Sequence, residues 1–235
     1  MKVTENLYAY LWPGLTFAEL MRYGNNSNSY VIADSIVVNN KRCHIIVDPG
    51  HLSNERGTDC LNTRLEEMVR DGIEAHDIGL VLNTHWHADH CQASQYFKSE
   101  HKALVAIGKL EASLLRSSMP EIEPDIYLSE GDLNLDDAGL KIIDTPGHSP
   151  GAISIYWPKM KALFTGDVIF YENTGRVDIA GASGDQLRES IEKLAKLKIE
   201  YLLTGHQYEA PGIIQGQDDI KANFDFVKRH VFPLL

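Results

Sequence analysis

The sequence of 235 residues predicts an α/β (α+β) protein with four layers, in which two β-sheets face each other and helices cover both outer faces. Two observations predict this αββα sandwich. Apolar runs of strand length form two groups, one in each half of the chain, and single helices interrupt each group. The hydrophobic fraction is 43%, and no linker-like stretch divides the chain, so that residues 1–235 are expected to form a single domain. A doubly wound parallel sheet fits this order of elements less well.

The first group begins near the N-terminus. Strands are expected at 3–11, 29–38, 43–47, 78–82 and 103–107. Between the third and fourth of them, Leu61, Leu65, Met68 and Val69 recur at helical spacing, and Gly72 ends that helix. A short helix is expected at 108–116.

The second group repeats this organisation. Strands are expected at 126–128, 140–143, 153–157, 162–164 and 201–203, the last strand of the chain. Leu187, Ile191, Leu194 and Leu197 indicate an amphipathic helix before the last strand. A C-terminal helix carries an apolar stripe of Ile220, Phe224, Val227 and Val231, which is interpreted as core, with a homodimer contact as the alternative.

Residues 12–23 are too long for a tight hairpin and too apolar for an ordinary solvated loop. Two interpretations stay open. The segment either tucks into the core, or it forms an apolar flap over a functional site.

The charge balance limits the classes of partner. The formal net charge is −11, which disfavours a nucleic acid or an anionic membrane and favours a small-molecule substrate. No run is long enough to span a bilayer, and the first residues lack the apolar core of a secretion signal. Cys43, Cys60 and Cys91 form no CxxC pair, so a cytoplasmic location is expected.

A cluster of metal-binding side chains follows the expected strand at 78–82. His85, His87, Asp89 and His90 fall within six consecutive positions. A lone histidine is usually a hydrogen-bonded core residue, but packing these four together without a metal would leave polar groups unsatisfied. Imidazole nitrogen and carboxylate oxygen suit zinc, iron or manganese better than magnesium or calcium. The cluster therefore predicts a metal site.

Three later strands also end in a side chain that binds metals. Each of these side chains directly follows a glycine, which lets the backbone turn sharply and approach an ion closely. They are His148, Asp167 and His206.

Together these residues resemble the ligand set of the metallo-β-lactamase superfamily. The pattern is His85-x-His87-x-Asp89-His90, His148, Asp167 and His206, with Asp48 at the first motif, and the similarity covers about residues 30–206. The resemblance implies a metallo-β-lactamase-like sandwich with the site at one edge. It also implies that His85, His87 and His148 hold one ion, that Asp89, His90 and His206 hold a second, and that Asp167 bridges them. Asp48 is implied to orient a ligating histidine, with a turn-capping role as the alternative.

The implied activity is that of a metal-dependent hydrolase. A hydroxide that bridges two divalent ions would attack a thioester, ester or lactone, and Asp89 would act as the catalytic carboxylate that takes its proton. Zinc is the expected metal, with iron or a mixed zinc and iron pair as alternatives.

The segment Gly175-Arg176-Val177-Asp178, followed by residues 184–191, is similar to the glyoxalase II-like branch of the superfamily, which includes persulfide dioxygenases. Arg176 is interpreted either as an ion-pair partner of Asp178 or as a contact for an anionic substrate group. Tyr171 is a candidate for the substrate pocket, and a packed aromatic is the alternative. The sequence departs from this branch in two places. The stretch after His206 is short, which disfavours the glutathione recognition of glyoxalase II. Cys91 stands where a small residue is usual, and its thiol is expected to be buried.

Two alternatives to the hydrolase stay open. One is an oxidoreductase similar to persulfide dioxygenase, with a single iron on His85, His148 and Asp167. The other is a non-catalytic binding protein on the same fold. A nuclease is disfavoured by the acidic balance, and a β-lactamase by the absent secretion signal and by aspartate at position 167, where one large class of zinc β-lactamases has cysteine.

Overall fold

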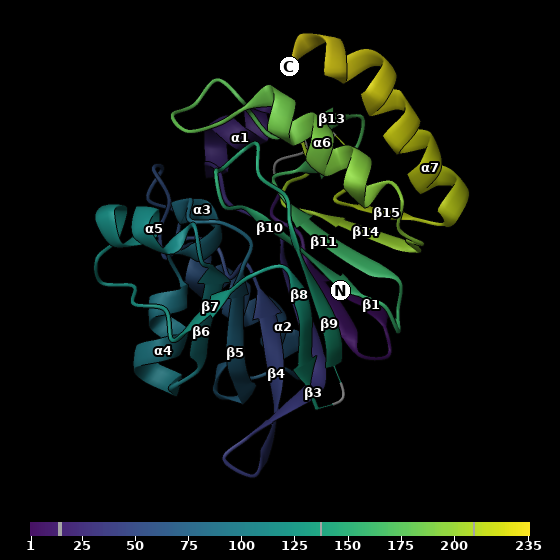
Figure 1. Ribbon diagram of the computed structural model, residues 1–235. Helices are drawn as coiled ribbons and strands as arrows, with labels where there is room; N and C mark the ends of the chain where they lie inside the picture. Colours follow the sequence, from purple (N-terminus) through teal and green to yellow (C-terminus); the bar gives the residue numbers. More distant parts are fainter. Residues whose placement is uncertain (14–15, 137, 209) are drawn as a thin grey trace.

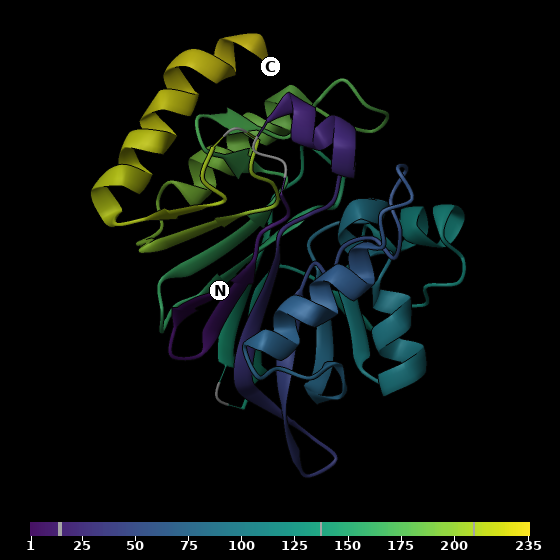
Figure 2. The same cartoon turned by 180° about the vertical axis from the view of Figure 1, so that it is seen from behind.

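The computed structural model describes residues 1–13, 16–136, 138–208 and 210–235, and it has four layers (Figure 1). The N-terminal half supplies one sheet with its helices, and the C-terminal half supplies most of the other, with helices over its far side. Figure 2 shows the same layers from behind, with the yellow C-terminal helix on one outer face and the blue and teal helices of residues 60–118 on the other. The predicted αββα sandwich is therefore confirmed.

The first sheet has the strand order β1-β2-β3-β4-β5-β6-β7. Its strands are β1 (Lys2–Thr4), β2 (Leu7–Tyr10), β3 (Ser29–Val38), β4 (Lys41–Val47), β5 (Ile78–Asn83), β6 (Leu104–Gly108) and β7 (Ile126–Leu128). Pairing is antiparallel from β1 to β4 and parallel from β4 to β7. Because β4 and β5 are parallel neighbours, the loops that follow them emerge at the same edge.

The second sheet has the order β15-β14-β11-β10-β9-β8. Its strands are β8 (Gly131–Leu135), β9 (Ala138–Asp144), β10 (Ile153–Trp157), β11 (Ala162–Gly166), β14 (Tyr201–Thr204) and β15 (Ile213–Gln215). Only the β11–β14 pair is parallel among the pairs of this sheet that the structure describes. A separate two-stranded ribbon, β12 (Ile169–Phe170) and β13 (Asn173–Thr174), follows β11.

The helices are short. They are α1 (Phe17–Tyr23), α2 (Cys60–Arg70), α3 (Ala88–Cys91), α4 (Ser94–His101), α5 (Ala112–Ser118), α6 (Gly184–Leu194) and α7 (Gln217–Phe226), with 3₁₀ turns at Ala75–Asp77 and Phe232–Leu234 and a π turn at Val227–Val231. The side chain of Asp59 caps the N-terminus of α2, and that of Ser183 caps α6.

Three apolar clusters fill the three interfaces between the four layers. The central cluster lies between the sheets and includes Ile45, Leu82 and Phe164. A second cluster joins the first sheet to α2, α4 and α5, and a third joins the second sheet to α6 and α7. The third cluster includes Ile220, Phe224 and Val227, and Val231 packs against it partly buried, so the core interpretation of the C-terminal stripe is confirmed.

Several predicted boundaries were wrong. Residues 3–11 form two paired strands rather than one, and the helix expected at 108–116 begins only at Ala112, after a turn. The strand at 201–203 is followed by β15, which has only three residues. Strand β8 escaped prediction because its sequence is polar and most of its residues are at least partly exposed, as expected at a sheet edge.

The apolar segment 12–23 forms α1 in part. The buried indole of Trp12 donates a hydrogen bond to the carbonyl of Gly24 at 3.0 Å, and Thr16 and Glu19 cap the start of the helix reciprocally. Trp12 thus supports the core interpretation at its own position. Residues 14 and 15 and the side chains at 17, 20 and 21 lie outside the described residues, so the flap stays a prediction.

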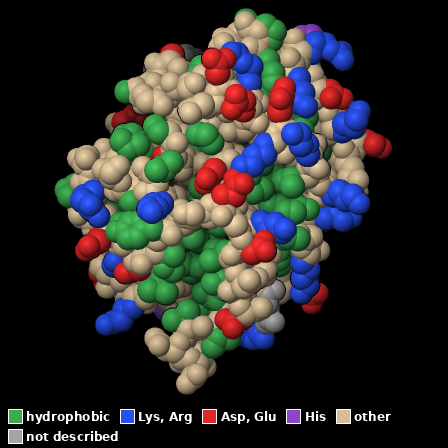
Figure 3. Space-filling model, in the orientation of Figure 1, with side chains coloured by type: hydrophobic (Ala, Val, Ile, Leu, Met, Phe, Trp, Pro, Cys, Tyr) green, Lys and Arg blue, Asp and Glu red, His purple; other side chains and the backbone are tan. Residues whose placement is uncertain are grey.

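The surface carries charges of both signs. Figure 3 shows Lys and Arg interspersed with Asp and Glu on the face that includes α6 and α7. Across the described ranges, no helix combines the length and the apolar composition that a bilayer span requires.

Candidate metal centre

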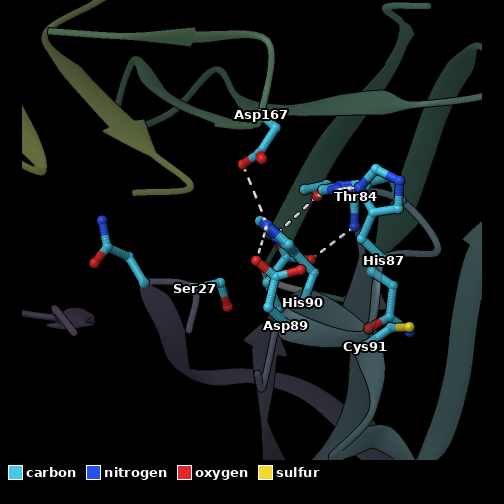
Figure 4. Close-up of polar contacts among 12 residues, drawn as sticks. Ser27, Thr84, His87, Asp89, His90, Cys91 and Asp167 are labelled. Atoms are coloured by element: carbon cyan, nitrogen blue, oxygen red, sulfur yellow. Dashed lines mark hydrogen bonds and ion pairs between the residues drawn. The ribbon is translucent and has the colours of Figure 1, made fainter. Parts of the chain in front are cut away.

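The metal-binding side chains predicted from the sequence meet at one edge of the sandwich. His85, His87, Asp89 and His90 lie in the loop after β5 and in α3, and the others follow β9, β11 and β14. Figure 4 shows Asp167 extending from its loop toward His90, which rises from α3 in the other half. The site is therefore built by both halves of the chain.

One group consists of His85, His87 and His148, whose ligand atoms all lie within 4.8 Å of one another. Nδ1 of His87 lies 3.0 Å from Nε2 of His85 and 2.9 Å from Nε2 of His148. Burial, reinforced by the neighbouring imidazoles, lowers the pKa of His85 well below its usual value and that of His87 to about 4. Both rings are therefore neutral near pH 7 and present lone pairs that a cation accepts.

A second group consists of Asp89, His90 and His206. Nε2 of His206 lies 3.3 Å from Oδ2 of Asp89 and 3.2 Å from Nε2 of His90. Burial alone would lower the pKa of both histidines, but Asp167 and Asp89 outweigh it and raise both pKa values to about 10. These carboxylates thus attract positive charge to this group, which a divalent cation would supply in place of protons.

Asp167 lies between the two groups. Its Oδ1 is 3.2 Å from Nε2 of His90 and 3.4 Å from Nε2 of His206, whereas its Oδ2 is 3.4 Å from Nε2 of His148. Oδ1 is buried and has no hydrogen bond of acceptable geometry. A buried carboxylate oxygen without a hydrogen bond, facing several ring nitrogens, fits a cation better than a packed core.

The outer nitrogens of three histidines are fixed by oxygen acceptors. Nδ1 of His148 lies 2.9 Å from the carbonyl oxygen of Arg176, and Nδ1 of His206 lies 3.1 Å from that of Asn26. Nδ1 of His90 lies 2.9 Å from Oδ2 of Asp48. Because these acceptors require N–H on Nδ1, each Nε2 is free to bind a metal.

Asp48 is held in turn by Thr84. The backbone N–H of Thr84 donates to Oδ1 at 2.8 Å, and its hydroxyl donates to Oδ2 at 2.7 Å. Asp48 has φ +49°, a conformation that aspartate tolerates better than most residues. It therefore stands behind His90, and its implied role in orienting a metal ligand stays a prediction.

Two glycines let the backbone approach Asp167. A Cβ on Gly205 would lie 2.4 Å from Oδ1 of Asp167, and one on Gly175 would lie 2.0 Å from its carbonyl oxygen. Side chains at these positions would displace the carboxylate or its loop.

A cleft of about 580 Å³ opens above the cluster. Phe170, Ile179 and Tyr208 give it apolar walls. The Tyr208 ring stacks on His206 with a centroid separation of 5.1 Å, and its hydroxyl donates to Oδ1 of Asn25 at 3.1 Å. Nδ2 of Asn25 then donates to Oδ2 of Asp89 at 2.6 Å, which orients that carboxylate.

The two substrate-contact candidates lie in different places. Arg176 lines the cleft, and its largely exposed guanidinium pairs with Asp178 at 2.9 Å, which is the ion-pair interpretation. Tyr171 instead lines a neighbouring groove with Pro211 and Phe226. Adjacent residues of a strand-like segment point to opposite sides, so Phe170 faces the cleft and Tyr171 does not.

The thiol of Cys91 is buried, as expected, and lies 3.1 Å from the carbonyl oxygen of Trp86. Sequence reasoning missed Asn25, Tyr208 and Glu111, a buried carboxylate beside the ligand loops. The weak signals available were the polar run before β3, an aromatic two residues after His206, and an acidic residue soon after β6.

Comparisons with known proteins agree with this geometry. The sequence pattern of the metallo-β-lactamase superfamily matches residues 22–206. The chain is 35% identical over 204 residues to a probable metallo-hydrolase of Methanocaldococcus jannaschii, with 80% of this chain and 91% of that protein aligned. It is 34% identical over 146 residues to a hydroxyacylglutathione hydrolase of Chelativorans sp., which covers 61% of this chain and 53% of that protein.

Among solved structures, the fold is similar to that of the BLEG-1 B3 metallo-β-lactamase, with a TM-score of 0.65 at 23% identity, covering 95% of this chain and 97% of that one. At this identity the likeness shows a shared fold and leaves the substrate open.

Proposed function

Because the chain belongs to the metallo-β-lactamase superfamily, we propose that it is a hydrolase that uses two divalent metal ions to cleave a thioester, an ester or a lactone. The superfamily resemblance predicted from the sequence is thereby confirmed. The finer proposal concerns the number of ions, the residues that hold them and the bond that is cleaved.

One ion would be held by His85, His87 and His148, and the other by Asp89, His90 and His206, with Asp167 shared. This assignment rests on Asp167, whose Oδ1 faces His90 in the second group and whose Oδ2 faces His148 in the first. The nitrogen and carboxylate donors suit zinc, and iron or a mixed pair is compatible with the same set. Such ions would supply an activated water at neutral pH and polarise a carbonyl oxygen.

The protein itself would supply a carboxylate that accepts a proton. Burial tends to raise the pKa of Asp89, but in the metal-free protein the positive charges of His90 and His206 lower it below the usual value, and bound cations would likewise favour the ionised group. Asp89 lines the cleft, and Asn25 fixes one of its oxygens. We infer that Asp89 would receive the proton of an attacking water.

The cleft supports a substrate with an apolar part and an anionic part. Phe170, Ile179 and Tyr208 would contact the apolar part, and Arg176 at the rim would attract the anionic group. A thioester is favoured by the likeness to a hydroxyacylglutathione hydrolase, although the aligned region is only 53% of that relative.

Metal analysis combined with an activity screen tests this function. Protein purified without added metal would be subjected to elemental analysis and then assayed on thioesters, esters, lactones and a persulfide. We expect about two ions per chain and hydrolysis of at least one acyl substrate, lost in His206→Ala and kept in His101→Ala, which alters a histidine outside the cluster. One iron per chain with oxygen uptake on the persulfide would instead identify an oxidoreductase.

A further inference from the structure

A buried carboxylate, that of Glu111, stands behind the ligand loops of the first histidine group. Glu111 lies at the turn between β6 and α5 and is 0% exposed. It occupies the N-cap position of α5, but its side chain makes no capping hydrogen bond to that helix. The carboxylate is directed at other segments of the chain.

Those segments are two loops from opposite halves of the protein. The backbone N–H of Trp86 donates to Oε2 of Glu111 at 3.0 Å. The hydroxyl of Ser149 lies 2.7 Å from both carboxylate oxygens, and the backbone N–H of Gly151 donates to Oε1 at 2.6 Å. A single side chain thus joins the loop after β5 to the loop after β9.

The joined positions are adjacent to metal-binding histidines. Trp86 stands between His85 and His87, and Ser149 directly follows His148. These three histidines form the first group. Nδ1 of His87 lies 3.0 Å from Nε2 of His85 and 2.9 Å from Nε2 of His148. A shift of either loop would separate His148 from the other two.

The surrounding backbone leaves Glu111 little freedom. A Cβ on Gly108 would lie 2.6 Å from the carbonyl oxygen of Gly151, and a Cβ on Gly151 would lie 2.9 Å from the nitrogen of Glu111. The turn and the second loop are therefore in close contact. Burial raises the pKa of Glu111, while the hydrogen bonds from Ser149, Trp86 and Gly151 oppose that effect. A carboxylate in such a place carries a desolvation cost that a purely apolar contact would avoid.

We propose that Glu111 is a positioning residue that holds His85, His87 and His148 at the spacing needed to bind one divalent ion. The role rests on the proposed function in that it concerns the same metal centre. Outer hydrogen-bond partners of metal ligands typically contribute about 10–100-fold to metal affinity. Because the hydrogen-bond partners of Glu111 belong to the two loops that carry the first group, its loss should weaken the binding of one ion and spare that of the other.

Two substitutions test this role. Glu111→Gln keeps the shape of the side chain but has only one oxygen that accepts hydrogen bonds. Its amide N–H therefore faces the backbone N–H of either Trp86 or Gly151, and one of these two hydrogen bonds is lost. Ser149→Ala removes only the hydroxyl and leaves both backbone donors in place. Asn25→Ala is the matched control, because Asn25 contacts Asp89 in the second group.

The readouts are Co²⁺ and Zn²⁺ titrations against a chelator, the visible spectrum of the Co²⁺ form, and urea unfolding of the metal-free protein. For Glu111→Gln we expect one of the two ions to bind about 10–100-fold more weakly, with an altered Co²⁺ spectrum for that ion. Ser149→Ala should show a smaller loss of affinity for the same ion, and Asn25→Ala should lower the affinity for the other ion.

Wild-type affinity for both ions in Glu111→Gln and Ser149→Ala would overturn the positioning role. Equal weakening of both ions would also overturn it, because Glu111 would then act on the fold as a whole. If Glu111→Gln fails to fold, the comparison of Ser149→Ala with Asn25→Ala decides. A wild-type protein that binds two ions but hydrolyses no acyl substrate would refute the proposed function while the titrations still judge Glu111.

Discussion

The substitution Asp48→Asn examines how a ligating histidine is oriented. Asparagine has the shape of aspartate and tolerates the φ of +49° found here, so that the backbone should not change. Its Oδ1 can still accept from the Thr84 backbone, as Oδ1 of Asp48 does at 2.8 Å. Its Nδ2, however, would face Nδ1 of His90, which lies 2.9 Å from Oδ2 of Asp48.

Two donors cannot share this contact. His90 must either lose the hydrogen bond or move its proton to Nε2, and the second choice removes the nitrogen that would bind a metal. The lost charge-assisted hydrogen bond is worth roughly 1.5–3 kcal/mol of metal-free stability. The affinity for the second ion should fall by about 10–100-fold.

Asp34→Asn is a matched control, because Asp34 also has φ +49° but has a largely exposed side chain 3.7 Å from His44. It should alter the free energy of unfolding by only about 0–1 kcal/mol and leave metal binding unchanged. Urea unfolding after chelation and competition titration with Zn²⁺ measure both quantities. If Asp48→Asn binds two ions as tightly as the wild type, the orienting role of Asp48 is refuted.

Asp167→Ala should lose both ions, whereas His206→Ala should lose mainly the second ion. Elemental analysis after dialysis would distinguish the two variants. Full activity in His206→Ala would favour a single-iron enzyme. Gly205→Ala places a Cβ 2.4 Å from Oδ1 of Asp167. This substitution should destabilise the protein by roughly 1–3 kcal/mol and weaken metal binding. Gly139→Ala is the control, because a Cβ there meets no atom within 4 Å and metal binding should not change. The metal-free protein should lose stability as the pH rises from 6.5 to about 10. Folding raises the pKa of His90 and His206 from 6.5 to about 10, because their carboxylate neighbours outweigh burial, so this stabilising contribution is complete below pH 6.5 and disappears as the pH rises through about 10. Urea midpoints at intervals across this range should fall for the wild type and fall less for Asp167→Ala; equal slopes would contradict the assignment.

The strands and the candidate metal ligands were predictable because each leaves a local signal. A buried strand such as β11 is a run of mostly apolar residues, and Asp167, directly after Gly166 at its end, is evident without any partner. Strands β8 and β15 left no such signal, because an edge strand needs few apolar residues and a three-residue strand is too short to show periodicity.

The residues that orient the site were not predictable for a different reason. Glu111 reads in the sequence as an ordinary acidic residue at the start of a helix, and Asn25 reads as part of a polar loop. Their roles depend on partners that are 38 and 64 positions away, Ser149 and Asp89 respectively.

By itself, the sequence determined which chemical groups this protein brings to its site, because a residue's capacity to bind a metal is a property of its own side chain and of the strand that ends beside it. Only the tertiary structure decided how those groups are aimed. It placed Phe170 rather than Tyr171 in the cleft, gave His90 its Asp48 acceptor, and turned Glu111 from its own helix toward two loops. Orientation depends on hydrogen bonds between segments distant in the chain, and these exist only once the two sheets have packed together.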